Sequence, residues 1–288
     1  VYGLPFDSGV TGMYYRKDLL AKAGFSDKDM ENITWDRYIE IGSKVMAITG
    51  KKMLGIDPND NGLIRVMMQS AGRWYFDKDG KLDIKGNPAF KAALETQAKL
   101  FKAGIVKPVT NWAEYVGAVN KGDVASITTG VWITGAVKSE KSQAGLWAVA
   151  PTPKLNVPGA THASNLGGSS WYVLSGGKEK AMAVDFLNEI FAKDTEFYQT
   201  ILISRGAVGT LMSSRAGKAY SDADLFFGGA QVWLRFSDWL AKVPSVNYGM
   251  YTYEGDAAVS AQLPALNQGV PVDQLIDKIH QQLAVQVK

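Results

Sequence analysis

Cysteine is absent from this chain, and histidine is scarce, with two residues in 288, His162 and His280. Without cysteine there is no disulfide, no thiol nucleophile and no cysteine-ligated metal. The compartment stays open, because exported bacterial proteins also fold without disulfides. Neither histidine has a second histidine or an acid at ligand spacing. A metal site and a Ser-His-Asp triad are therefore both disfavoured.

Long apolar runs and charge of one sign are also missing. Runs such as Leu225-Phe226-Phe227 are far too short to cross a bilayer. The chain carries 31 Lys and Arg against 28 Asp and Glu, scattered along its length, which predicts no nucleic-acid partner. It begins at Val1 without a signal peptide, so we expect that it was processed or is a piece of a longer protein.

Aromatic residues, by contrast, make up 11% of the chain. Aromatics at this density serve hydrophobic cores and also the surfaces that bind sugars. At the start, two apolar runs at 2–6 and 13–15 flank a patch of small and polar residues at 7–12. This pattern fits a crossing between two lobes or an edge strand with an ordinary turn. The length of 288 residues favours two lobes.

Helix and strand signals alternate early in the chain and become helical later, which predicts an α/β fold with a helical tail. Thr34 caps a helix at 35–48, and Asn87-Pro88 opens another that Gly104 closes. Further helices are expected at 16–23, 63–70, 112–120, 179–191, 195–203, 230–241, 257–266 and 272–285, and a short one begins at Trp132. Strands are expected at 54–56, 124–129, 147–150 and 167–174, with a hairpin at 76–82 and a long loop at 151–165.

Known catalytic and cofactor motifs are not matched. Asp57-x-Asn59-x-Asn61-Gly62 resembles half of a calcium loop, but Met68 replaces the required bidentate acid, so a polar loop capping the next helix is expected. Gly168-Ser169-Ser170-Trp171 is not a nucleophile elbow. There is no phosphate loop or dinucleotide fingerprint. We expect no metal or cofactor.

Several acids lie near glycine and aromatic residues, namely Asp7, Asp60, Glu114, Glu254 and Asp256. Two of them could form the carboxylate pair of a glycosidase. The same side chains also suit recognition without chemistry, because a carboxylate accepts hydrogen bonds from neighbouring sugar hydroxyls. The residues alone leave both possibilities open.

Motifs spread over nearly the whole chain resemble, in order, those of the extracellular solute-binding proteins of family 1. These are the carbohydrate receptors of ABC importers, related to maltose-binding protein. The matching segments are Tyr2-Gly3-Leu4-Pro5-Phe6-Asp7, Lys17-Asp18-Leu19-Leu20, Thr34-Trp35, 120–132 ending in Gly130-Val131-Trp132, 147–153, Gly167-Gly168-Ser169-Ser170-Trp171 and 180–187. The family's N-terminal α/β segment has no counterpart here.

The resemblance implies an α/β, two-lobe periplasmic-binding-protein type II fold with an incomplete first lobe. Residues 1–7 would form the first inter-lobe crossing and 166–171 the second. Residues 8–165 and 230–288 would form the C-terminal lobe. Residues 172–229 would be the remaining helical part of the N-terminal lobe with the third crossing. The missing N-terminal segment of the same protein is then an expected partner.

The resemblance also implies a function, the binding component of an ABC sugar importer and not an enzyme. It would close about its hinge on a mono- or oligosaccharide and deliver it to the permease subunits in the membrane. It would be periplasmic, or extracellular and held by a lipoprotein anchor that is not in this chain. The segment 243–249 is similar to that of members for lactose- or arabinose-type sugars.

Carried over by position, the expected ligand-binding residues lie at the crossings, on one loop and at two helix starts. They are Asp7, Asp60, Asn61, Trp132, Gly168, Trp171, Tyr253 and Glu254. Trp112, Trp147, Trp233 and Trp239 are expected in cores or partner surfaces. Two alternatives remain, a glycoside hydrolase with paired carboxylates and a receptor of the same fold for a polyol or glycerol phosphate. A phosphate would call for Arg65 or Arg73 in the cleft.

Overall fold

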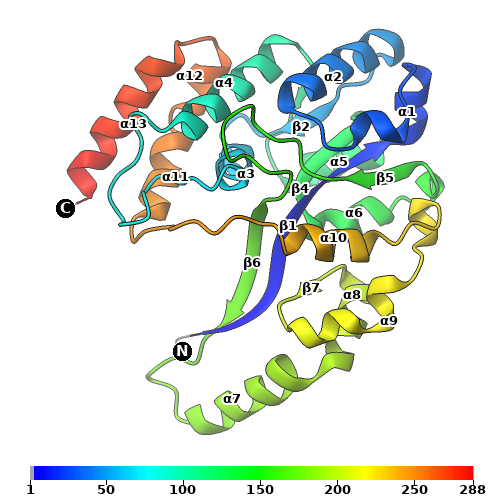
Figure 1. The fold of residues 1–288 in the computed structure, drawn as a ribbon, viewed down its shortest axis with the longest axis vertical. Coiled ribbons are helices and arrows are strands. Elements are labelled where there is room, and N and C mark those ends of the chain that lie inside the picture. The colour runs from blue at the N-terminus through cyan, green and yellow to red at the C-terminus, as the bar shows by residue number, and fades with distance from the viewer. Residues whose placement is uncertain (1–2, 288) are drawn as a thin grey trace.

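The longest strand, β1 (Leu4–Arg16), organises the sheet of this computed structural model, which describes residues 3–287 (Figure 1). Shorter strands pair antiparallel with β1 along both halves. They are β4 (Ser126–Gly130) and β5 (Trp147–Ala150) on its C-terminal half, and β6 (Asn165–Trp171) and β7 (Val208–Gly209) on its N-terminal half. A separate parallel pair joins β2 (Leu54–Ile56) to β3 (Val106–Pro108).

The small residues near the start of β1 let a second strand cross it closely. β6 pairs with β1 in a register that shifts between Pro5 and Asp7 and again between Ser8 and Val10. A Cβ on Gly9 would lie 2.1 Å from the carbonyl oxygen of Leu166, so only glycine fits there. The expected break in the apolar run is thus the place where β6 presses against β1. Residues 1–2 of the predicted first crossing lie outside the described residues.

Helices surround this frame. The α-helices are α1 (Lys17–Lys22), α2 (Trp35–Thr49), α3 (Gly62–Ser70), α4 (Pro88–Lys102), α5 (Trp112–Asn120), α6 (Thr134–Lys138), α7 (Lys180–Leu187), α8 (Thr195–Arg205), α9 (Lys218–Ser221), α10 (Val232–Leu240), α11 (Thr252–Ser260), α12 (Leu263–Asn267) and α13 (Val272–Gln286). The 3₁₀ helices are η1 (Asp27–Met30), η2 (Val131–Ile133), η3 (Lys141–Gln143), η5 (Met212–Ala216) and η6 (Leu225–Phe227), and η4 (Asn188–Lys193) is a π-helix.

Two groups of buried side chains hold these elements together. One lies among α2, α3, α4 and the C-terminal helices, with Trp35, Tyr75 and Phe90 fully buried. The other lies around Tyr14 and Phe236, between the sheet and α10. In Figure 1 α7 stands apart from both, near the N-terminus, and none of its residues is buried. Within residues 3–287 no helix is long and apolar enough to traverse a bilayer.

The helix signals of the sequence are largely confirmed. Thr34 Oγ1 accepts from the backbone N–H of Arg37, and Asn87 Oδ1 accepts from two N–H groups of α4. One prediction is wrong, because the helix expected at 257–266 is two helices, α11 and α12. Pro264 lies in the first turn of α12, where it lacks an N–H to continue the preceding helix. The first of these, α11, begins at Thr252 and not at 257, so Tyr253 and Glu254 lie within it instead of before a helix.

Two strand predictions were wrong in their extent. β6 begins at Asn165 and ends at Trp171, earlier than the expected 167–174, because pairing with β1 decides its length. The expected hairpin at 76–82 reduces to a single bridge between Phe76 and Leu82 around the Asp-Gly turn. In both cases the partner strand, and not the local sequence, sets the element.

Candidate functional site

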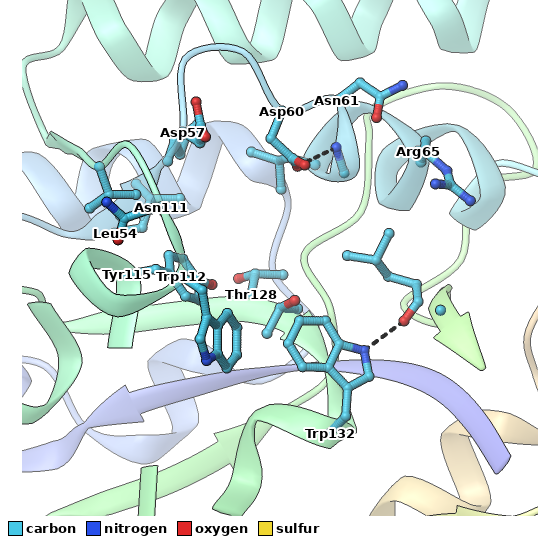
Figure 2. A pocket seen from close by; sticks show the side chains of 18 residues that line it. Leu54, Asp57, Asp60, Asn61, Arg65, Asn111, Trp112, Tyr115, Thr128 and Trp132 are labelled. Carbon is cyan, nitrogen blue, oxygen red and sulfur yellow. Dashed lines mark hydrogen bonds between the residues drawn. The ribbon is translucent and has the colours of Figure 1, made fainter. Parts of the chain in front are cut away.

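A cavity of about 480 Å³ opens where β2, α3, α5, β4, η2 and β6 meet. This volume falls within the range of small-molecule sites. Figure 2 shows aromatic side chains on one side of the cavity and acids on the other. The two sides come from segments far apart in the sequence, the loop before α3 and the helix α5 with η2.

One side, here called the aromatic wall, consists of Trp112, Tyr115 and Trp132. Trp112 and Tyr115 lie three residues apart on α5, which puts both on one helix face. Their rings stack with centroids 6.0 Å apart, and the Trp112 ring lies 5.7 Å from that of Trp132. Trp112 is 55% exposed and Trp132 37%. Large rings left open around a cavity provide faces for the C–H surface of a sugar.

Trp132 is held by a hydrogen bond to the strand β6. Its indole Nε1 donates to the carbonyl oxygen of Leu166 at 2.8 Å (Figure 2). Gly130 leaves room for this bond, because a Cβ there would lie 2.1 Å from the indole nitrogen. Gly167, with φ of 91°, takes the left-handed backbone that favours glycine. The ring is thus fixed by a hydrogen bond and by two positions without side chains.

The opposite side, here called the polar wall, consists of Asp57, Asp60, Asn61 and Arg65. Asp60 Oδ1 accepts from the N–H of Gly62 at 2.7 Å, and Asp57 Oδ1 accepts from the N–H of Asn59 at 2.9 Å. Among residues 3–287 no hydrogen bond reaches the second oxygen of either carboxylate. The expected polar loop is therefore present, with two acceptors left for a ligand.

A hydrogen-bonded group lies behind the polar wall. Asn61 Nδ2 donates to Asp256 Oδ1 at 2.7 Å and to the Tyr75 hydroxyl oxygen at 3.1 Å. Arg65 Nη1 lies 3.4 Å from Asp256 Oδ2, and its guanidinium lies over the Trp74 ring at 5.4 Å. Burial, followed by the charge of Asp256, raises the pKa of Tyr75 well above its ordinary value. Tyr75 is therefore a neutral donor near pH 7.

Two polar atoms of the cavity lining are buried without a partner among the described residues. They are Thr128 Oγ1 and Arg65 Nε. An unsatisfied buried polar group costs about 1–3 kcal/mol. Both atoms lie beneath the surface of the cavity, where they carry this cost without facing its interior.

The phenol of Tyr115 on the aromatic wall is neutral at pH 7. Burial, with the nearby charge of Asp60, raises the pKa of Tyr115 above its ordinary value near 10. The aromatic wall therefore carries no charge at neutral pH. The charged groups that line the cavity, Asp57, Asp60 and Arg65, all lie on the polar wall.

No group of three or more His, Asp or Glu residues within 3–287 is arranged to hold a metal ion. Neither histidine lines the cavity. His162 Nδ1 lies 3.1 Å from the carbonyl oxygen of Thr152, and burial lowers the pKa of its ring. It lies in the segment between β5 and β6.

The structure brings three of the eight predicted ligand residues, Asp60, Asn61 and Trp132, to the cavity lining. Gly168 lies beside the lining residue Gly167, with φ of 98°. The other predicted residues lie outside the lining. Asp7 faces β6 and β7, Trp171 packs on Phe6 and Phe191, and Tyr253 and Glu254 lie on α11, where Tyr253 is 83% exposed. Their part in ligand binding stays a prediction.

Other lining residues escaped the sequence analysis. Trp112 was expected in a core or partner surface, whereas it lies on the aromatic wall. Trp147, Trp233 and Trp239 are buried as expected. The spacing of Trp112 and Tyr115 signals a shared face, but nothing local tells whether that face is covered. Asp57 and Asn111 also line the cavity, and only the folding of their loops brings them there.

Comparison with known proteins shows to which family the chain belongs. Residues 1–228 match the family described as bacterial extracellular solute-binding protein. The chain belongs to this family. Over all of its residues it is 58% identical to the lactose-binding protein of Rhizobium radiobacter, of which it covers 68%. It is 31% identical over 201 residues to the arabinooligosaccharide-binding protein of Bacillus subtilis, covering 68% of this chain and 45% of that protein.

Solved structures show the same fold. The ABC transporter associated binding protein of B. animalis subsp. lactis, in complex with β-1,6-galactobiose, superposes with a TM-score of 0.80. The match covers 98% of this chain and 72% of that one at 23% identity. The expected α/β fold of the two-lobe periplasmic-binding-protein type is thereby confirmed. The division of the chain into crossings and lobes stays a prediction.

Proposed function

We propose that this chain belongs to the sugar-binding component of an ABC importer, and that it holds a galactoside of disaccharide size in the cavity between α3 and α5. The observation that carries the proposal is the pairing of the aromatic wall with the polar wall around one cavity. The aromatic rings suit the apolar faces of pyranoses, and the free carboxylate oxygens suit their hydroxyls. The 58% identity to a lactose-binding protein favours lactose as the first ligand to test.

The function is binding without turnover. The relatives described above are binding proteins. The bound sugar would be delivered chemically unchanged to the permease subunits in the membrane. The family description places its members outside the cell, and we propose a periplasmic location or a lipid-anchored one at the cell surface.

Calorimetry with lactose, and thermal unfolding with and without it, test the proposal. We expect saturable binding that raises the unfolding temperature, because a ligand that binds only the folded state stabilises it. Incubation of the protein with lactose and with an aryl galactoside should release no monosaccharide and no aryl alcohol. Hydrolysis that disappears in Asp60→Asn would instead support the glycosidase alternative. Absence of binding to lactose and to galactobiose would contradict the proposed ligand class.

The phosphate alternative is disfavoured by the charges that line the cavity. Arg65 does lie on the polar wall, as a phosphate ligand would require, but it pairs with Asp256. Asp57 and Asp60 place two carboxylates on the same wall. Like charges close together are unfavourable, so this wall suits a neutral, hydroxylated ligand better than glycerol phosphate.

A further inference from the structure

Asp256 lies outside the cavity lining but contacts two residues of the polar wall. Its Oδ1 accepts from Asn61 Nδ2 at 2.7 Å and from the Tyr75 hydroxyl at 3.0 Å. Its Oδ2 lies 3.4 Å from Arg65 Nη1. Asp256 comes from α11, 195 residues from Asn61 in the sequence. One carboxylate of the C-terminal region therefore supports two cavity residues of α3 and its N-cap.

The carboxylate imposes one orientation on the Asn61 amide. A carboxylate only accepts hydrogen bonds, so Asn61 must turn its nitrogen toward Asp256. The same nitrogen also donates to the Tyr75 hydroxyl oxygen at 3.1 Å, and Tyr75 in turn donates to Asp256. No hydrogen bond within residues 3–287 reaches Asn61 Oδ1. A ligand therefore meets this amide as an acceptor.

Arg65 is a hydrogen-bond donor close to the Asn61 acceptor. Its guanidinium is confined between Asp256 and the face of Trp74. A guanidinium only donates hydrogen bonds, and the Arg65 side chain is 29% exposed. A sugar hydroxyl is both donor and acceptor, so it can donate to Asn61 Oδ1 while it accepts from Arg65.

We propose that Asp256, assisted by Tyr75, is a positioning residue that fixes Asn61 as an acceptor and Arg65 as a donor, so that the polar wall selects a ligand hydroxyl bridging the two. The inference rests on the proposed sugar-binding function and adds how the site discriminates among sugars. Asp256 acts through its neighbours and does not itself contact the ligand.

Asp256→Asn in the full-length protein tests this role. An amide at this position can donate as well as accept, so Asn61 becomes free to turn over, and Arg65 loses its counter-charge. Calorimetry compares lactose with its series of monodeoxy analogues. In the wild-type protein at least one analogue should bind about tenfold more weakly than lactose, the loss expected for one hydrogen-bonding group. In Asp256→Asn this ratio should fall to about twofold or less.

Asp83→Asn is a matched control. Asp83 Oδ2 accepts from Asn87 Nδ2 at 3.2 Å and lies 3.8 Å from Arg73 Nη1. It repeats the combination of Asp, Asn and Arg outside the cavity, so its variant should leave the ratio unchanged. Tyr75→Phe removes the assisting hydroxyl and keeps the ring. It should lower the ratio partly, and it provides the test if Asp256→Asn does not fold.

The outcomes separate this inference from the proposed function. If the wild-type protein binds lactose selectively, and Asp256→Asn and Tyr75→Phe keep the same ratio between lactose and its analogues, the positioning role is overturned and the function stands. An equal change in Asp83→Asn would also overturn it, since the effect would then be one of general stability. If the wild-type protein binds none of these sugars, the proposed function fails, and the inference fails with it.

Discussion

The two walls of the cavity are built in different ways. The aromatic wall consists of rings that are partly open to solvent, and one hydrogen bond, from Trp132 to Leu166, fixes one of them. The polar wall consists of side chains held by the helix start of α3 and by Asp256 and Tyr75 behind it. One wall offers surface and the other offers a fixed pattern of donors and acceptors.

This difference separates affinity from selectivity. Contact between an aromatic face and a sugar ring depends on area and tolerates different hydroxyl configurations. A hydrogen bond to a charged group contributes about 1.5–3 kcal/mol and depends on where the hydroxyl lies. We therefore expect changes in the aromatic wall to weaken all sugars alike, and changes in the polar wall to alter their ranking.

The largest effect is expected from Trp132→Ala, which removes the ring of the aromatic wall that is fixed by a hydrogen bond. Affinity for lactose should fall about 100-fold, as for an aromatic residue that anchors an interface, and by a similar factor for every sugar that binds. Calorimetry across a panel of disaccharides measures this. Tyr172→Ala is the control, because Tyr172 is an exposed aromatic residue outside the cavity lining. A loss confined to one sugar would break the proposed division between the walls.

Asp60→Asn tests the polar wall with little change of shape. The amide keeps an oxygen for the Gly62 N–H but removes the charge, so affinity should fall about tenfold. The loss should differ among sugars, since it depends on a hydroxyl at one position. The same titrations provide the measurement, with the exposed Asp79→Asn as the control. If the affinity fell by the same factor for all sugars, Asp60 would not contribute to selectivity, and the proposed difference between the walls would be contradicted.

Replacing Trp132 or Trp112 by phenylalanine separates the effect of ring size on affinity from the effect of the hydrogen bond that positions the ring. Trp132→Phe keeps an aromatic face but loses the bond to Leu166, so affinity should fall about tenfold. Trp112 has no such bond within residues 3–287, so Trp112→Phe should cost only about threefold, for its smaller ring. Each variant is the control for the other in one calorimetric series. Equal losses would show that the hydrogen bond to Leu166 does not position Trp132.

The smallest effect is expected from pH. Burial is the largest cause that raises the pKa of Tyr115 on the aromatic wall and of Tyr75 behind the polar wall. Both phenols stay neutral through pH 7–9, so neither should change the affinity in this range. Above about pH 10 the unfolded chain loses phenol protons that the folded chain retains, and the free energy of unfolding should fall.

Denaturant unfolding between pH 8 and 10.5 measures this fall, which Tyr75→Phe should reduce. Tyr14, Tyr15 and Tyr38 contribute to it as well, because burial raises their pKa values too. An affinity that changes between pH 7 and 9 in wild-type protein but not in Tyr115→Phe would contradict a neutral aromatic wall.

Much of the local structure follows from the sequence. Thr34 and Asn87 cap their helices as predicted, and the strand at 54–56 and the helix at 112–120 have the predicted bounds. Capping and turn residues act on neighbours within three or four positions, so their effect is visible in the sequence itself. The ordered motifs indicated the family, which the match over residues 1–228 confirms.

The site was visible only in part. Asp60, Asn61 and Trp132 were predicted and line the cavity, whereas Trp112, expected in a core or partner surface, is 55% exposed and lines it as well. A tryptophan has the same chemistry in a core and on an open wall, and its exposure depends on what packs against it. Asp256 was named only as one of several acids near glycine and aromatic residues, because its contact with Asn61 spans 195 residues.

The amino-acid sequence by itself determined where helices begin, where β1 is interrupted by small residues, and to which family the chain belongs. The tertiary structure decided which rings remain open, which carboxylates keep a free oxygen, and that Asp256 turns the Asn61 amide. The physical reason is the range of the interactions. Caps and turns are local, whereas a cavity and the polarity of its walls arise from contacts between segments that only folding brings together.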